Sequence, residues 1–218
     1  MRPVILASEP FLGVRPAKSY IYYVILSPVG AYYKEGLNPV KIKVEDRYVR
    51  ATPGMSAAKT GGNYAASLFP AEEAHHAGFT QVLWLDPVER KYVDEVGTMN
   101  IMFRIGDEVV TPPLAGTILP GVTRDSALTI MRDWGLKATE RQVSIDEILA
   151  AAGSGHLREA WGTGTAAVVS PVGELSYKGE RIVINGGKIG DLTQRLYNAI
   201  VDIQYARVPD TRGWTVEV

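Results

Sequence analysis

The chain has 218 residues, and its 23 Lys+Arg against 24 Asp+Glu give a formal net charge of −1. Hydrophobic residues make up 46% of the sequence, which is enough for a substantial core, whereas the near-neutral charge argues against binding to a phosphate backbone. The absence of cysteine excludes thiol nucleophiles, cysteine-bound metals and disulfides, and no apolar run reaches the roughly 18 residues of a membrane span. We therefore expect a cytoplasmic protein with no metal site and with neither nucleic acid nor a membrane as a partner.

Short apolar runs bounded by turn residues predict strands in the first half of the chain. A helix is predicted over Asn63–Ala77, where apolar residues recur at helical spacing before Gly78. Pro70 inside this segment can split or kink the helix. The predicted strands cover Val4–Ala7, Tyr20–Leu26, Val40–Glu45, Gln81–Leu85, Tyr92–Glu95 and Asn100–Ile105.

The second half mixes helices with short strands. Ser144 is expected to cap a helix, with Glu147 at the reciprocal position of the capping box. The expected helices are Val122–Trp134, Ile145–Ala152 and Gly190–Tyr205. The expected strands are Ala138–Val143, Glu159–Trp161 and Ala166–Val169 around a glycine turn, and a hairpin of Leu175–Tyr177 with Arg181–Ile184. Because strict βαβ alternation is missing, the pattern predicts a mixed α/β fold, with a distorted β-barrel or mixed sheet flanked by helices.

One lysine lies among small, uncharged residues in AAKTGGNYAAS, residues 57–67. These surroundings predict a partly desolvated Lys59, and desolvation lowers the pKa of an amine and makes it a usable nucleophile. Gly61 and Gly62 allow a ligand to approach the backbone closely, and the Tyr64 hydroxyl can hydrogen-bond a phenolate oxygen. The alternative is a surface lysine before a Gly-Gly turn.

Two glycine-containing segments can bind an anion. In residues 118–126, ILPGVTRDS, the amides of Val122 and Thr123 begin a predicted helix and have no acceptor within it. In residues 161–167, WGTGTAA, two threonines alternate with two glycines and can form a second anion nest. The alternatives are simple helix initiation with Arg124 and Asp125 solvated, and a strand bulge or tight turn.

A carboxylate at the end of a predicted strand completes the set. Glu95 lies in DEVGTMN, residues 94–100, where it can pair with a protonated ring nitrogen or can be an ordinary turn carboxylate. Taken together, Lys59, Tyr64, Glu95 and the two anion-binding segments require a ligand with an aldehyde, a phenolate, a ring nitrogen and a phosphate. Pyridoxal 5'-phosphate has all four groups.

Five segments also resemble one known family, the branched-chain amino acid aminotransferases of fold type IV. They are AAKTGGNYAASL, QVLWLD, DEVGTMNIMF, TPPLAGTILPGVTRDS and GTGTAAVVSPV, and they occur in the family's order. The resemblance extends from Arg2 to Trp214. It implies the large domain of this fold, with pyridoxal phosphate as the cofactor.

The resemblance implies a role for each matching cofactor residue. Lys59 corresponds to the Schiff-base lysine, which also moves the proton between the substrate and the cofactor. Tyr64 corresponds to the tyrosine on the phenolic oxygen, and Glu95 to the carboxylate that keeps the pyridine nitrogen protonated, so that the ring acts as an electron sink. The phosphate site corresponds to Val122, Thr123, Thr163 and Thr165, and Arg50 lies in a family segment near the cofactor.

Substrate contacts and partners also follow from the resemblance. The amides of Thr165 and Ala166 correspond to the α-carboxylate site, and Arg2 to an arginine that binds substrate carboxylates. The implied reaction moves an amino group between Leu, Ile or Val and 2-oxoglutarate, in a homodimer. A D-amino-acid transaminase, an aminodeoxychorismate lyase and a non-catalytic remnant domain are the alternatives.

The resemblance also bears on domain organisation. In the family a small N-terminal domain precedes the Arg-Pro strand and supplies an arginine to the cofactor phosphate. Because this strand begins at Arg2, we expect residues 1–218 to be the large domain alone, folded but with weak activity or none.

Overall fold

The structure is a computed structural model that describes residues 1–28 and 37–217. The chain divides into two units, residues 1–32 and residues 33–218. In the described part of the first unit, β1 (Arg2–Ala7) pairs with β2 (Tyr20–Ile25) in an antiparallel hairpin, with Arg2 opposite Ile25. The strands predicted over Val4–Ala7 and Tyr20–Leu26 are confirmed, although β1 begins two residues earlier than predicted.

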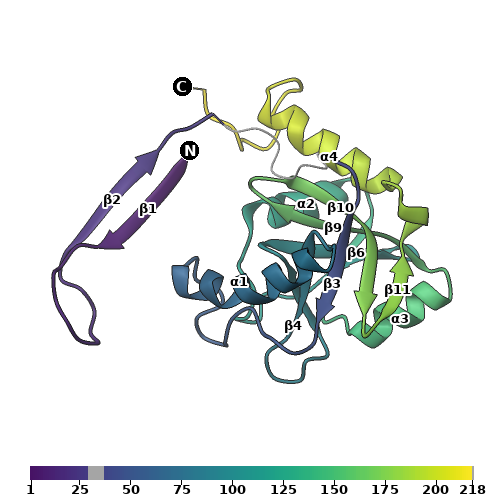
Figure 1. The fold of residues 1–218 in the computed structure, drawn as a ribbon. Helices are drawn as coiled ribbons and strands as arrows, with labels where there is room; N and C mark the ends of the chain where they lie inside the picture. The colour runs from purple at the N-terminus through teal and green to yellow at the C-terminus, as the bar shows by residue number, and fades with distance from the viewer. Residues whose placement is uncertain (29–36, 218) are drawn as a thin grey trace. The chain divides into compact units, whose positions relative to one another are not determined.

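A closed ring of strands forms the centre of the second unit (Figure 1). Strand β9 pairs with β10 on one side and with β6 on the other, so that the sheet curls into a barrel. The two pairings of β3, with β10 and with β4, are parallel, and the remaining pairings of the ring are antiparallel. The ring consists of β3 (Val40–Glu45), β4 (Gln81–Leu85), β5 (Val93–Val96), β6 (Met99–Ile105), β9 (Leu157–Gly164) and β10 (Val168–Tyr177).

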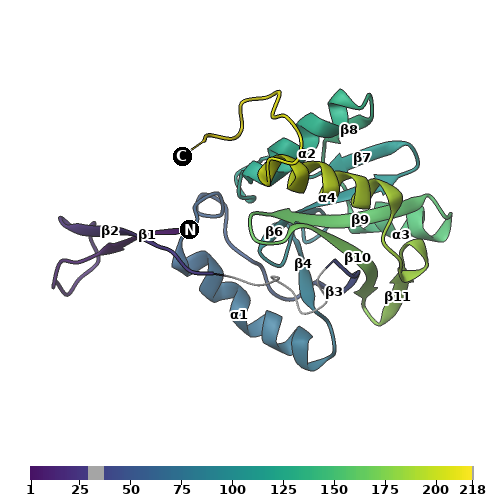
Figure 2. The ribbon, with the colours of Figure 1, turned by 90° about the horizontal axis from the view of Figure 1, so that it is seen from above.

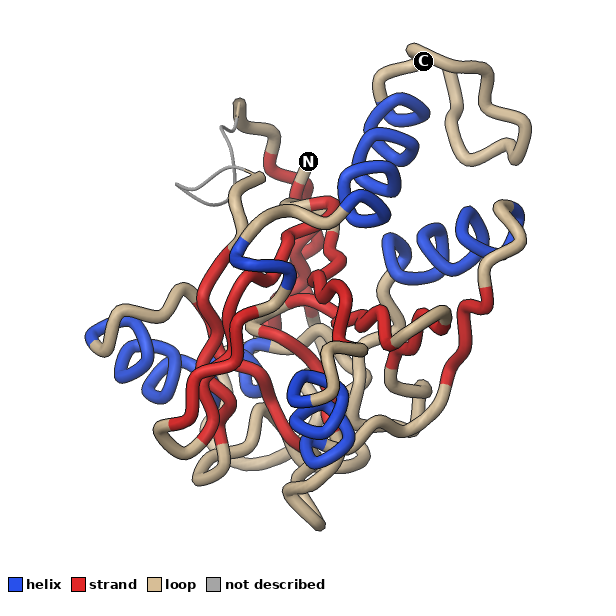
Figure 3. Tube along the Cα trace, turned by 90° about the vertical axis from the view of Figure 1, so that its right-hand side faces the viewer, coloured by secondary structure: helices blue, strands red, loops and turns tan. Residues whose placement is uncertain are grey.

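Further strands and the helices surround this ring. Helix α1 packs on β4, α2 and α4 pack on β9 and on each other, and α3 packs on β9 and β11 (Figure 2). In the second unit the strands gather at the centre and the helices lie outside them, as the fold prediction required (Figure 3). The remaining elements are β7 (Glu108–Thr111), β8 (Lys137–Glu140), β11 (Glu180–Val183), α1 (Gly61–His76), α2 (Val122–Asp133), α3 (Ile145–Gly153), a 3-10 turn (Asn185–Gly187) and α4 (Asp191–Gln204).

Strand β6 is buried on both faces, and it separates two parts of the core. Because side chains alternate along a strand, Ile101 and Phe103 pack with Leu83 and Leu175 in one cluster. Met102 points the other way and packs with Trp161, under α2 and α4. The barrel wall is therefore held rigidly from both sides at the point where β5, β6 and β9 run together. None of the helices in the described residues has the length and apolar character needed to cross a membrane.

The structure corrects several sequence predictions. Helix α1 runs through Pro70 without interruption, and β7 is a strand that the pattern did not predict. Strand β8 ends at Glu140, three residues earlier than expected. Strand β9 continues through the two glycines of WGTGTAA, so the turn lies at residues 165–167 instead of at the glycines.

The capping prediction for α3 is confirmed in one half only. The backbone N–H of Glu147 donates to the Ser144 hydroxyl over 3.1 Å, as the cap requires. The Glu147 carboxylate does not return to the cap, because Arg141 binds it at 2.7 Å. A nearby guanidinium is a stronger partner for a carboxylate than a backbone amide.

Candidate active site

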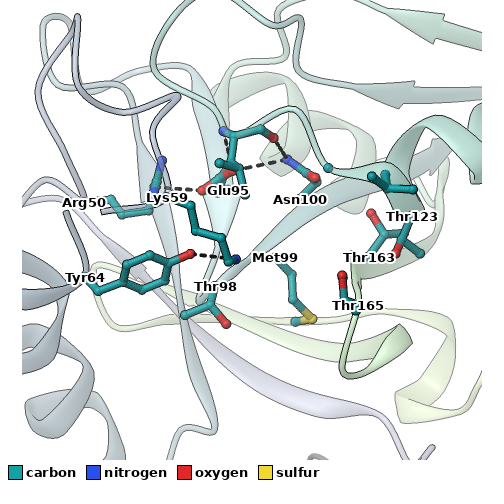
Figure 4. Close-up of a pocket in the computed structure, with 14 residues that line it drawn as sticks. Arg50, Lys59, Tyr64, Glu95, Thr98, Met99, Asn100, Thr123, Thr163 and Thr165 are labelled. Carbon is teal, nitrogen blue, oxygen red and sulfur yellow. Dashed lines mark hydrogen bonds and ion pairs between the residues drawn. The ribbon is translucent and has the colours of Figure 1, made fainter. Parts of the chain in front are cut away.

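Residues from distant parts of the second unit line a single pocket of about 440 Å³, part of which is open to solvent. The pocket lies where β5, β6 and β9 meet the start of α2 (Figure 4). It is lined by Arg50, Lys59, Tyr64, Glu95, Thr98, Met99, Asn100, Leu119, Gly121, Val122, Thr123, Thr163, Gly164 and Thr165. The structure thus brings together the eight residues that the sequence predicted to bind the cofactor.

The strand register explains why these side chains meet. Val96 pairs with Met99, so β5 and β6 are joined by a two-residue turn, and Gly97 has the positive φ of 56° that this turn requires. Glu95 is therefore opposite Asn100. On the other edge of β6, Asn100 is opposite Thr163 of β9. Opposite residues of antiparallel strands share a face, so Glu95, Asn100 and Thr163 form one row across the pocket.

Glu95 is a buried carboxyl with a fixed orientation. Its Oε2 lies 2.7 Å from Arg50 Nε, and its Oε1 accepts a hydrogen bond from the Leu119 amide over 3.0 Å. Burial raises the pKa of Glu95 to about 7, although the Arg50 charge and the Leu119 hydrogen bond act in the opposite direction. A carboxyl poised in this way is readily ionised by a cationic group that enters the pocket.

Lys59 and Tyr64 face each other beside this carboxyl. Lys59 Nζ donates to Tyr64 Oη over 3.1 Å, and Tyr64 lies in the first turns of α1 (Figure 4). The expected desolvation of Lys59 is wrong, because its side chain is exposed. The residues around it are too small to cover it. The segment before it is nevertheless anchored, since Asn63 Nδ2 donates to the carbonyl groups of Met55 and Ala58 over 2.6 and 2.8 Å.

The opposite side of the pocket is built to accept an anion. Helix α2 begins after Gly121, and no side chain among the described residues caps it. Its first amides therefore face the pocket without an acceptor in the helix. Thr163 is 1% exposed, and its hydroxyl has no hydrogen-bond partner among the described residues. Figure 4 shows Thr123, Thr163 and Thr165 together on this side. A buried hydroxyl aimed at a helix start favours a bound phosphate.

Arg124, expected to be solvated if α2 were a simple helix start, is buried. Its Nη2 donates to the Pro112 carbonyl and to Glu140 Oε2, both over 2.8 Å. This side chain fastens the first turn of α2 to the sheet. The alternative of a simple helix start with both Arg124 and Asp125 solvated is therefore wrong for Arg124, which Pro112 and Glu140 pair, although Asp125 is exposed.

Sequence reasoning missed several pocket residues. Asn100 and Leu119 lie in the quoted segments DEVGTMN and ILPGVTRDS, but no role was predicted for either. The position of Asn100 follows from the register of β5, β6 and β9. Met99 is tied to the glycines of β9, since a Cβ at Gly162 would lie 2.6 Å from Met99 Cε. These glycines therefore make room for a pocket side chain. Thr98 was also missed, whereas Gly121 and Gly164 lie in the two predicted anion-binding segments.

Two predicted substrate residues lie outside this set. Arg2 belongs to the first unit, and its contact with a substrate stays a prediction. Ala166 is exposed in the turn after Thr165, and its amide contact with a carboxylate is likewise a prediction.

Known proteins are similar to this chain in sequence and in fold. The chain is 53% identical to "Branched-chain-amino-acid aminotransferase 2" of Bacillus subtilis over 219 residues, which cover all of this chain and 60% of the relative. It is 53% identical to "Branched-chain-amino-acid transaminase 1" of the same organism, covering 62% of that relative. The chain thus spans about 60% of the length of the curated relatives it matches.

Solved structures agree with these relatives. The branched-chain amino acid aminotransferase of Escherichia coli superposes with a TM-score of 0.80 at 28% identity, covering 97% of this chain and 67% of that one. The enzyme of Thermoproteus uzoniensis, solved with norvaline, gives 0.78 at 27% identity, covering 94% and 64%. The sequence pattern of amino-transferase class IV matches residues 2–175. This chain therefore belongs to the class IV aminotransferase family.

Proposed function

We propose that this chain binds pyridoxal 5'-phosphate and transfers the amino group of Leu, Ile or Val to 2-oxoglutarate. The observation that carries the proposal is one pocket with three features at its sides: the Lys59 amine, the Glu95 carboxyl and the start of α2. The names of the similar Bacillus subtilis proteins support the branched-chain substrates. A solved branched-chain amino acid aminotransferase complexed with N-(5'-phosphopyridoxyl)-L-glutamate, 27% identical over 81% of this chain, supports the cofactor.

The pocket fits pyridoxal phosphate by the chemistry of its side chains. The phosphate would be held by the amides of Val122 and Thr123 and by the hydroxyl of Thr163, which is buried and lacks a partner among the described residues. Thr165 lies beside them at the edge of the pocket. When bound, the cofactor supplies an aldehyde carbon and a conjugated ring that accepts electrons from the substrate.

Lys59 would hold the cofactor and move the proton. Its Nζ would be the amine that holds the cofactor, and it would also be the base that takes the proton from the α-carbon of the amino acid. The Tyr64 hydroxyl, 3.1 Å away, orients Nζ and can bind the phenolic oxygen of the cofactor. Exposure of Lys59 leaves room for an amino acid to enter beside it.

Glu95 would hold the proton on the ring nitrogen. Its carboxylate must be ionised for this role, and burial alone opposes ionisation. Arg50, itself 8% exposed and 2.7 Å away, favours the ionised form by its charge. Arg50 is in turn fixed by the carbonyl groups of Ser56 and Thr117, to which it donates over 3.2 and 3.1 Å.

The substrate side combines polar and apolar groups. We infer that the amides of Thr165 and Ala166 bind the α-carboxylate of the substrate. Met99 is 4% exposed and lines the pocket. Its flexible thioether side chain suits contact with a branched aliphatic group.

A direct assay tests this function. The purified chain, loaded with pyridoxal phosphate, is given L-leucine and 2-oxoglutarate, and the 2-oxo acid formed from leucine is measured. We expect slow formation, in line with the weak activity predicted for residues 1–218, that is absent from Lys59→Ala and further reduced in Glu95→Gln. Equal rates in the chain and in Lys59→Ala, or a preference for D-leucine, would contradict the proposal.

We also propose that the protein is a cytoplasmic homodimer. Leu68 and Phe69 on α1 are 67% and 60% exposed, and the Phe69 ring stacks edge-on against Tyr48 at 5.7 Å. An exposed apolar patch of this kind is typical of a subunit interface. Light scattering should give a dimer mass for the chain and a lower mass for Phe69→Ser. A monomer mass for the unaltered chain would contradict this part of the proposal.

A further inference from the structure

The Asn100 side chain closes a ring of hydrogen bonds at the centre of the pocket. It is 4% exposed, and its Nδ2 donates to Glu95 Oε1 over 3.1 Å and to the Leu119 carbonyl over 2.9 Å. The Leu119 amide donates in turn to the same Glu95 oxygen over 3.0 Å. Each of the three residues is thus bonded to the other two (Figure 4). Both hydrogens of the Asn100 amide are used.

The partners of this amide determine its orientation. Glu95 Oε1 and the Leu119 carbonyl are both acceptors, so the nitrogen has to face them. The carbonyl oxygen of Asn100 then faces Gly121, where an added Cβ would lie only 2.1 Å from Oδ1. Gly121 is the residue that precedes the first turn of α2. One side chain therefore contacts the Glu95 carboxyl at one end and the start of the helix at the other.

We propose that Asn100 is a positioning residue that holds the Glu95 carboxyl in register with the first turn of α2. The inference rests on the proposed function, in which the ring nitrogen of the cofactor binds at Glu95 and its phosphate at α2. A rigid ligand that binds at both places needs a fixed separation between them. Asn100 sets this separation because it is bonded to Glu95 and to Leu119, two residues before Gly121.

Arg50 cannot replace this contact. It approaches the other oxygen, Glu95 Oε2, from the loop before α1, and its remaining hydrogen bonds go to the carbonyl groups of Ser56 and Thr117, outside α2. Without the Asn100 amide, Oε1 keeps one donor, and the Leu119 carbonyl loses its side-chain partner. The charged groups that act on Glu95, namely Arg50, Lys59 and Asp94, would stay in place. The loss is therefore one of geometry and of two hydrogen bonds, with no change of formal charge.

Two ligands separate a register role from general damage to the site. Pyridoxal 5'-phosphate engages both ends of the pocket, whereas pyridoxal lacks the phosphate and engages one end only. We expect Asn100→Ala to weaken binding of pyridoxal phosphate by about tenfold to a hundredfold. Binding of pyridoxal should weaken clearly less. Asn198→Ala, the same substitution on the exposed face of α4, is the matched control and should change neither affinity.

A nearly isosteric variant gives a second readout. Asn100→Asp keeps the shape of the side chain, but an ionised carboxyl cannot donate and faces two acceptors. We expect binding of pyridoxal phosphate to be weakest at high pH and to recover in part at low pH, where the introduced carboxyl is protonated and donates one hydrogen bond. Asn100→Ala is the reference variant, and its affinity for pyridoxal phosphate should not recover at low pH.

Measurements without cofactor separate this inference from the proposed function. In the cofactor-free chain, Asn100→Ala should raise the pKa of Glu95, followed by NMR of labelled glutamate, and should speed hydrogen exchange of the Leu119 amide. If the unaltered chain binds no pyridoxal phosphate, the proposed function fails, and these two readouts still decide the role of Asn100. Unchanged readouts, or equal losses of affinity for the two ligands, would overturn the inference while leaving the proposed function standing.

Discussion

Arg50 Nε lies 2.7 Å from Glu95 Oε2, and both side chains are buried, at 8% and 3% exposure. Despite this cation, burial raises the pKa of Glu95 from 4.5 to about 7. Desolvation of the carboxylate therefore outweighs the attraction of one guanidinium in this part of the barrel. Because burial and the Arg50 charge act on the pKa of Glu95 in opposite directions, a second positive group in the pocket determines whether Glu95 is ionised.

The stability of the cofactor-free chain should therefore depend on pH through Glu95. The folded chain holds this proton more tightly than the unfolded chain, so the stabilising effect is complete below about pH 4.5 and is lost as the pH rises through about 7. Glu95→Gln has no such titration. Its free energy of unfolding should therefore rise by up to about 3 kcal/mol relative to that of the unaltered chain as the pH increases from about 4.5 to about 7. Urea unfolding at both ends of the range, with the exposed Glu89→Gln as control, measures the difference. Parallel pH profiles for Glu95→Gln and the unaltered chain would contradict this account.

A second buried carboxylate anchors α4 to the barrel. Glu159 accepts hydrogen bonds from the amides of Leu192 and Thr193 over 3.2 and 2.8 Å and binds Arg104 at 3.0 Å. Glu159→Ala leaves these donors without their acceptor and should cost roughly 2–4 kcal/mol of unfolding free energy. The denaturant midpoint should shift accordingly, while Glu180→Ala on the exposed side of β11 should shift it little. A loss below about 0.5 kcal/mol for Glu159→Ala would show that the hydrogen bonds from α4 to Glu159 are dispensable for stability.

Gly162 is required by the Met99 side chain. A Cβ at this position would lie 2.6 Å from Met99 Cε and 3.1 Å from Val96 Cγ1, so Gly162→Ala should cost about 1–3 kcal/mol of stability. Met99→Ala in the same chain should restore part of this loss, because it removes the nearer of the two contacts. Gly153→Ala, where no atom lies within 4 Å, is the control and should be neutral or stabilising. Additive losses in the double variant would show that Met99 is not the cause.

Asn63 should matter more for turnover than for folding. Its two hydrogen bonds hold the segment before Lys59, so Asn63→Ala should let Nζ move away from Tyr64. Misplacement of a reacting group by about 1 Å can cost roughly a hundredfold in rate. We expect such a loss in kcat with a stability loss of about 1–2 kcal/mol. Asn198→Ala is the control, and a variant that loses stability without losing kcat would contradict the positioning role.

Much of the fold follows from local patterns in the sequence. The alternation of VKIKVE predicts β3, and the apolar run QVLWL predicts β4 with the observed bounds. Glycines and caps predict the starts of α2 and α3 correctly. Ring closure could not be predicted in this way. It depends on β9 pairing with β6, which lies far away in the sequence, as well as with the adjacent strand β10.

The site residues, too, were predicted where a local segment indicates them and missed where only the tertiary structure does. Lys59, Tyr64, Glu95, Thr123 and Thr163 lie in recognisable segments, and the pocket contains them all. Asn100 was missed because its role arises from cross-strand register, which no single segment encodes. The predicted desolvation of Lys59 was wrong for a related reason, since the burial of a side chain depends on what packs against it in three dimensions.

The most direct test of the account is to find where pyridoxal phosphate attaches. The purified 218-residue chain is incubated with pyridoxal phosphate, reduced with borohydride, digested and mapped by mass spectrometry. We predict one dominant pyridoxyl label, on the peptide that contains Lys59, and its loss in Lys59→Ala. A label on another lysine, such as Lys188, or a label of equal strength spread over the exposed lysines, would contradict the assignment of this pocket as the cofactor site.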